Sequence, residues 1–209
     1  MLTQTEAQVQ LAIDQQLDGD QVAETGWDDM RFSASSAKKL AGVDREPEDV
    51  AYHGGVLLNF EHETTKIRGI SFEAQLPHGY KLGTDLEFHI HVVLPVAGGG
   101  TATSEFVEFV LSYCWANLDG TFGTATTITK SVDVKDMSAD THLLWDFGSV
   151  LASNTSGTDG VSSMLICSLV RNSDAEVTVT PSTEDVYLLE ADFHYQIDQE
   201  RGSREEYTK

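Results

Sequence analysis

The chain has 209 residues, and its 34 acidic against 13 basic side chains give a formal net charge of −21. Nucleic acids and anionic membranes are bound through clustered Lys and Arg, so this composition argues against both as partners. A hydrophobic fraction of 40% is enough for a folded core, which excludes a disordered acidic chain. The acids are spread along the whole chain, which indicates a solvated surface and is also typical of proteins from salt-loving organisms.

Targeting and redox signals are sparse. No apolar stretch approaches the roughly 18 residues that span a bilayer. The N-terminal residues lack the pattern of a signal peptide. Cys114 and Cys167 both lie in apolar runs, so we expect two reduced, buried thiols and no disulfide.

The N-terminal region predicts a short helix followed by an anchoring arm, together covering residues 1–50. Residues 4–18 carry apolar side chains at helical spacing, and a helix of this length needs a partner in its own domain or in an oligomer. Large apolar residues within the polar stretch 19–50 predict a strap held on a surface. The expected anchor or oligomer contacts are Val9, Ile13, Leu17, Trp27 and Phe32.

Residues 51–198 have the alternation and turn signals of β-structure. We predict an all-β fold, a jelly-roll-like antiparallel β-sandwich, with an up-and-down barrel as the alternative. The final residues, 199–209, lose this alternation and predict an extended tail. The expected strands are 54–60, 66–76, 84–95, 104–116, 125–134, 142–147, 161–171, 175–180 and 185–197.

Three histidines share a pattern on two of these strands. His89 and His91 alternate with apolar residues, as does His194 on the last strand, which predicts that all three point away from the core. A His-X-His pair on a strand can chelate a metal ion, so His89, His91 and His194 form a candidate site for a structural metal. The alternative is a set of surface or interface histidines that only form hydrogen bonds.

Enzyme templates fit this chain poorly. The run from Gly83 to His89 and His91 resembles the opening of the first cupin motif, but Pro95 and Val96 stand where that motif has its glutamate. We find no nucleophile elbow, phosphate loop or zinc-protease motif, and therefore expect no catalytic residues and no enzyme activity. Sugar binding would need aromatic platforms, for which the candidates are Tyr80, Trp115 and Trp145; the alternative is that they are core aromatics.

Several segments together resemble a family of structural proteins of tailed viruses. They are WDDMRF at 27–32, QLPHGYKLGT at 75–84, FHIH at 88–91, LSYCWAN at 111–117 and DFHYQID at 192–198. In the family a proline occupies the position of Phe88. The resemblance spans about residues 27–209.

The resemblance implies a non-enzymatic virion protein of a tailed phage or a haloarchaeal virus. Such proteins resemble trimeric β-sandwich projections of the capsid, such as head fibres, turrets or decorations. The implied partners are two further copies of the chain and the major capsid protein or another virion protein, assembled in the host cytoplasm. A tail fibre or receptor-binding tip with a host-surface glycan as its ligand is the alternative, and a cupin-type metal enzyme is a further one.

Overall fold

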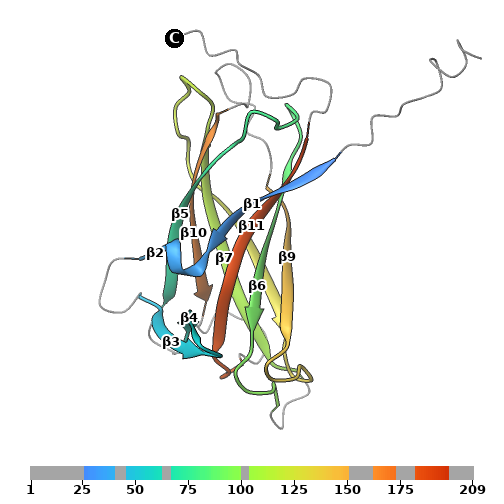
Figure 1. Cartoon of the computed structure of the whole chain (residues 1–209). Coiled ribbons are helices and arrows are strands. Elements are labelled where there is room, and N and C mark those ends of the chain that lie inside the picture. Colours follow the sequence, from blue (N-terminus) through green and yellow to red (C-terminus); the bar gives the residue numbers. More distant parts are fainter. Residues whose placement is uncertain are drawn as a thin grey trace, which may run out of the picture.

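A computed structural model describes residues 26–40, 46–62, 67–99, 104–150, 162–172 and 182–197. These residues form strands and one short 3-10 helix, η1 at Ala34–Ser36, and the strands build two antiparallel sheets (Figure 1). The strands are β1 Trp27–Ser33, β2 Lys38–Lys39, β3 Glu48–Tyr52, β4 Gly55–Phe60, β5 Arg68–Gln75, β6 Leu86–Val93, β7 Phe106–Ala116, β8 Thr126–Asp133, β9 His142–Val150, β10 Met164–Asn172 and β11 Val186–Gln196.

The connectivity is that of a jelly roll. One sheet has the order β3-β4-β11-β6-β9, with β1 also paired to β11, and the other has the order β2-β5-β10-β7-β8. From β4 onward each connection passes to the opposite sheet, except the step from β7 to β8. The central strands therefore form two facing four-stranded sheets, β4-β11-β6-β9 and β5-β10-β7-β8. The predicted sandwich is confirmed.

The core lies between the sheets because the strands alternate buried and outward side chains. Strand β7, for example, buries every second residue along most of its length. Aromatic rings from both sheets meet in the middle, where Phe88 lies 4.9 Å from Phe193 and 6.1 Å from Phe72 between ring centroids. Aromatic side chains of this size each bury a large apolar area, which stabilises the sandwich.

The predicted strap is part of the sandwich along its described length. Strand β1 pairs with β11 in a continuous antiparallel register, and Figure 1 shows the two strands lying side by side. Phe32 turns inward, 5.0 Å from Phe72 and 6.1 Å from Phe193 between ring centroids. The expected helix 4–18 and tail 199–209 lie outside the described residues, so the division into arm, sandwich and tail stays a prediction.

The two cysteines differ in their surroundings. Both are free thiols, as expected, but only Cys167 is buried in the core, where burial raises its pKa to about 12. Cys114 is partly exposed on the outer side of β7, so the expectation that both are buried was wrong for this residue. Nothing in the described part of the chain forms a helix long and apolar enough to cross a bilayer.

Candidate metal centre

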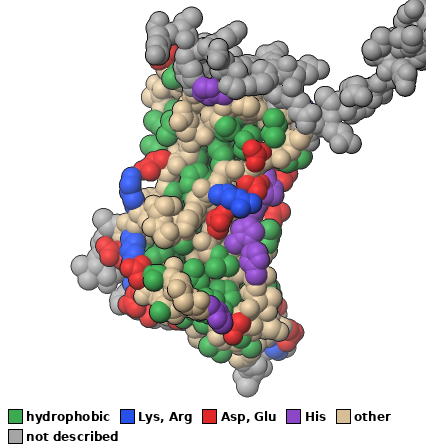
Figure 2. All heavy atoms as spheres, in the orientation of Figure 1, with side chains coloured by type: hydrophobic (Ala, Val, Ile, Leu, Met, Phe, Trp, Pro, Cys, Tyr) green, Lys and Arg blue, Asp and Glu red, His purple; other side chains and the backbone are tan. Residues whose placement is uncertain are grey.

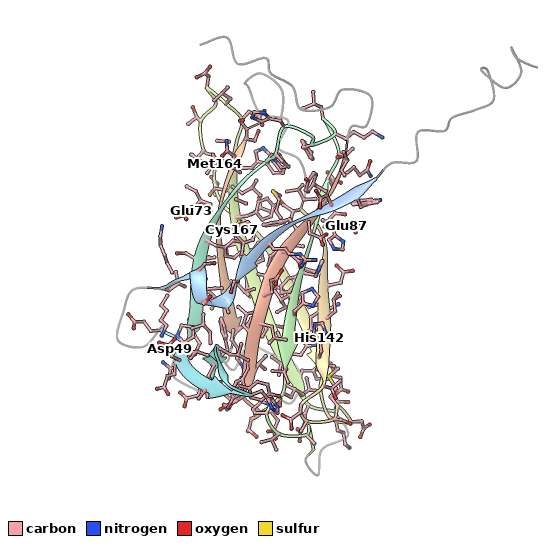
Figure 3. All side chains as sticks on the ribbon, in the orientation of Figure 1. Asp49, Glu73, Glu87, His142, Met164 and Cys167 are labelled. Carbon is pink, nitrogen blue, oxygen red and sulfur yellow. The ribbon has the colours of Figure 1, made fainter. Side chains whose placement is uncertain are left out.

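The outer face of the first sheet gathers most of the chain's histidines. Asp192 on β11 lies opposite His89 on β6, and Asp29 on β1 lies opposite His194 on β11. Figure 2 shows histidine side chains running down this face with acidic and basic side chains beside them. Figure 3 labels Glu87 on β6 and His142 on β9, two strands that are neighbours in this sheet.

Three side chains converge closely enough to bind one metal ion together. His89, His91 and Asp192 each offer one donor atom, and these atoms lie within 4.8 Å of one another. The Nε2 atom of His89 contacts Asp192 Oδ1, and the Nε2 atom of His91 lies 3.3 Å from Asp192 Oδ2. His89 and Asp192 are buried, whereas the His91 side chain is partly open to solvent.

Two further histidines flank this group without joining it. His142 on β9 places its Nε2 atom 2.7 Å from His91 Nδ1, so one of these nitrogens donates a hydrogen bond to the other. The ring of His194 lies 4.2 Å from the ring of His89 between centroids, and its Nε2 atom is 2.9 Å from Asp29 Oδ1. His194 is thus oriented by Asp29 and does not point at Asp192.

Burial shifts both His89 and Asp192 towards their uncharged forms. Burial, followed by the neighbouring His194 and His91, lowers the pKa of His89 to about 4. Burial also raises the pKa of Asp192 to about 7. An ion pair would instead raise the pKa of the histidine and lower that of the carboxyl group. Moreover, Asp192 Oδ1 accepts no hydrogen bond, so its contact with His89 lacks hydrogen-bond geometry.

This arrangement has the chemistry of a metal site. Two imidazole nitrogens and one carboxylate oxygen are donors that Zn²⁺ and other divalent first-row metals bind. Three protein ligands leave at least one coordination position for water or another group. The two strands that carry the donors, β6 and β11, are neighbours in the sheet, so a bound ion would join them.

The sequence anticipated part of this cluster. It predicted His89 and His91 on the outward face, where the structure places them together, and His194 beside them. It did not single out Asp192 as a ligand, nor His142, whose spacing along the chain is uninformative. The signal for Asp192 was available, because it shares the outward face of its strand with His194.

The expected anchor residues divide into two groups. Val9, Ile13 and Leu17 lie outside the described residues. Trp27 begins β1 and is 47% exposed, so it is available for a contact with another molecule. Phe32, in contrast, packs onto the core of its own chain.

The aromatic residues that could have stacked on a sugar are buried. Tyr80 is 1% exposed, and Trp115 and Trp145 are 5% and 3% exposed. All three belong to the hydrophobic core, which confirms the alternative interpretation and removes them as sugar platforms.

No family model and no curated protein matches the sequence. Among solved structures, the chain is similar to one from infectious bursal disease virus strain Gx, with 8% identity and a TM-score of 0.35, covering 83% of this chain and 34% of that one. The VP2 subviral particle of the same virus gives 10% identity and a TM-score of 0.35, covering 81% and 33%. Xylanase 10B of Clostridium thermocellum, in its CBM22-1–GH10 modules with xylohexaose, gives 14% identity and a TM-score of 0.37, covering 82% and 26%.

This chain therefore spans about a third or less of each of these proteins. Their TM-scores are below 0.5, and such distant likenesses carry no argument about what the chain does.

Proposed function

We propose that the chain is a non-enzymatic structural protein of a virus particle. In this proposal it forms a homotrimer, binds the major capsid protein or another virion protein, and projects from or decorates the capsid of a tailed virus. It is assembled in the host cytoplasm with the rest of the particle. The observation that carries the proposal is the way the fold joins the segments that resemble tailed-virus proteins.

Three of those segments are neighbouring strands. The segment 27–32 lies in β1, and the segment 88–91 lies in β6. The residues 192–197 cover the end of β11 and the residue after it. These strands are adjacent in the order β1-β11-β6. Segments separated by up to 160 positions of sequence thus form one continuous surface. A chance resemblance of scattered short motifs would not be expected to assemble in this way.

The other two segments contact the same region. Tyr80 forms a β-bridge with Ile197, and the backbone N–H of Lys81 donates to the carbonyl of Gln196 at 2.8 Å. The ring of Tyr80 lies 6.4 Å from that of Trp115, which belongs to segment 111–117. The resemblance therefore refers to one structural unit, and this supports a family relationship.

The fold is compatible with this function but does not select it. Jelly rolls occur in viral capsid proteins, in lectins and in cupins. A cupin-type centre inside the sandwich is disfavoured because His89 and His91 lie on the outer face, while the interior is filled by aromatic side chains. A sugar-binding tip is disfavoured because Tyr80, Trp115 and Trp145 are buried.

Quantitative mass spectrometry of purified virus particles tests the proposal directly. We expect the chain in the particles at a fixed ratio to the major capsid protein, and its absence from them would refute the proposal. Immunogold labelling then distinguishes the capsid from the tail, and specific binding on a glycan array would favour the receptor-binding tip.

Sedimentation of the purified chain tests the trimer. A net charge of −21 makes repulsion between copies strong in dilute buffer, and salt at about 1 M shortens the screening length to about 3 Å. We therefore expect a trimer at high salt that loosens after dialysis to low ionic strength. A monomer at every salt concentration would contradict the trimer, and a trimer indifferent to salt would contradict the halophilic interpretation.

A further inference from the structure

We propose that His89, His91 and Asp192 bind one divalent transition-metal ion, with Zn²⁺ as the expected ion, on the outer face of the sandwich. The ion would connect β6 to β11. This site is independent of the proposed place of the chain in a virus particle.

The distances between the donors favour a shared metal ion. Ligands at typical Zn–N and Zn–O distances in a tetrahedral site are about 3.3 Å apart. His91 Nε2 and Asp192 Oδ2 are 3.3 Å apart, and all three donor atoms lie within 4.8 Å. His89 Nε2 and Asp192 Oδ1 are closer together than two ligands of one ion, so a bound ion would have to separate these two side chains.

The unpaired carboxylate oxygen is an independent indication of a ligand. Asp192 is 2% exposed, and its buried Oδ1 atom accepts no hydrogen bond although it faces His89. Leaving a buried polar atom without a partner costs free energy, and such atoms are rare in folded proteins. A cation between Asp192 and the imidazoles would satisfy this oxygen.

The outer layer of the site also fits a metal. Metal-binding histidines usually donate their second ring N–H to a nearby acceptor, which fixes the orientation of the ring. If His91 binds the metal through Nε2, its proton lies on Nδ1 and is donated to His142 Nε2, 2.7 Å away. His142 is therefore a positioning residue that acts through His91.

The donor types narrow the choice of ion. Ca²⁺ and Mg²⁺ prefer sets made only of oxygen ligands, whereas imidazole with carboxylate suits Zn²⁺ and its neighbours. The surroundings also suit a cation, because two further acids lie near Asp192. Asp29 is on the paired strand β1, and Glu190 is on β11 itself. In the described part of this sheet, both acids are paired with the same basic side chain, Arg31.

Calorimetric titration of the full chain with Zn²⁺, together with metal analysis after dialysis, tests the site. We expect one Zn²⁺ per chain and a melting temperature that rises on binding. His142→Ala should weaken binding by about 10- to 100-fold because it removes only the acceptor of the orienting hydrogen bond. His91→Ala and Asp192→Asn should weaken it more than His142→Ala, because each removes a ligand.

The matched control is His53→Asn. His53 is exposed on a turn outside the cluster with a φ of 45°, a conformation that Asn tolerates, so binding should be unchanged. His91 is partly exposed, so His91→Ala is expected to fold, and circular dichroism verifies this. Stoichiometric binding that survives both His91→Ala and Asp192→Asn would show adventitious surface binding only and overturn the proposal, as would the absence of Zn²⁺ binding by the unmodified chain.

Discussion

Arg68 and Arg171 lie at facing positions of β5 and β10, and both are buried at the same end of the sandwich. Arg171 donates hydrogen bonds to the backbone carbonyls of Phe60 at 2.5 Å and Ser182 at 3.2 Å. Arg68 pairs with Glu61 at 2.6 Å and donates to the carbonyl of Glu46 at 2.8 Å. The two guanidinium groups therefore hold the segments that flank β3 and β4 and the segment that precedes β11.

Replacing Arg171 with Met should destabilise the fold by about 3 kcal/mol, because two hydrogen bonds from a charged donor are lost and two carbonyls lose their partner. Burial lowers the pKa of Arg171 to about 10, while the nearby carboxylates of Asp185 and Glu184 favour its charged form. Urea unfolding measures the loss. The control is Lys38→Met, which removes an exposed pair with Glu73 and should cost less than about 1 kcal/mol. Equal losses in the two variants would contradict a special role for Arg171.

Substitutions of Trp27 and Phe32 should distinguish effects on association from effects on stability, because the two residues lie on the same strand in different environments. Phe32→Ala removes a partly buried ring from the core and should destabilise the monomer by about 2–3 kcal/mol, below the range for fully buried Phe. Trp27→Ala changes a side chain that is 47% exposed and should cost less than about 1 kcal/mol. Denaturant unfolding and sedimentation of both variants provide the comparison.

If Trp27 is an oligomer contact, Trp27→Ala will weaken the trimer at high salt while leaving the monomer stable. An intact trimer in this variant would exclude Trp27 from the interface. A monomer destabilised as strongly as by Phe32→Ala would show that Trp27 belongs to the fold instead.

The two thiols should react at very different rates with a thiol reagent at pH 8. Cys167 is 1% exposed and its pKa is raised to about 12, so little reactive thiolate is present. Cys114 is partly exposed, and we expect one fast-reacting thiol per chain. Cys114→Ser should abolish the fast phase, whereas Cys167→Ser should leave it. Two fast-reacting thiols in the folded chain would contradict the burial of Cys167 in the core.

The Tyr52–Asp140 contact should appear as an alkaline titration. Tyr52 Oη donates to Asp140 Oδ1 at 2.6 Å, and this hydrogen bond raises the pKa of Tyr52 to about 12 from its usual 10. A raised pKa in the folded state means that this contribution to stability is complete below pH 10 and is lost as the pH rises towards 12. Phenolate absorbance measures the titration, and Asp140→Asn should shift the Tyr52 pKa back towards 10. An unshifted titration curve in that variant would mean that the contact does not persist in solution.

Sequence patterns predicted the sandwich well because its central strands combine alternation with clear turns. Strands β4 to β11 fall within a few residues of the predicted ranges, and only the expected strand 175–180 lies outside the described residues. Strands β1, β2 and β3 were missed, because β2 has two residues and the few apolar residues of β1 and β3 stand among acids. Such edge strands gain stability from their partners, β11, β5 and β4, which a local pattern does not reveal.

The candidate metal centre could be predicted only along single strands. Alternation on β6 indicated that His89 and His91 share a face, because side chains two positions apart point the same way. The position of Asp192 opposite His89 depends on the pairing of β11 with β6, and that of His142 on the pairing of β9 with β6. Pairings between strands so distant in sequence are set by the global topology, which local patterns in one sequence do not reveal.

Strand β11 follows all ten other described strands in chain order, yet it is the strand that β1, β4 and β6 share. During synthesis the earlier strands emerge from the ribosome first, but their sheet cannot close before β11 arrives. The face that carries the histidine cluster is therefore completed last. Neighbouring nascent chains on one messenger RNA would present no finished face of this kind to one another until β11 has left the ribosome.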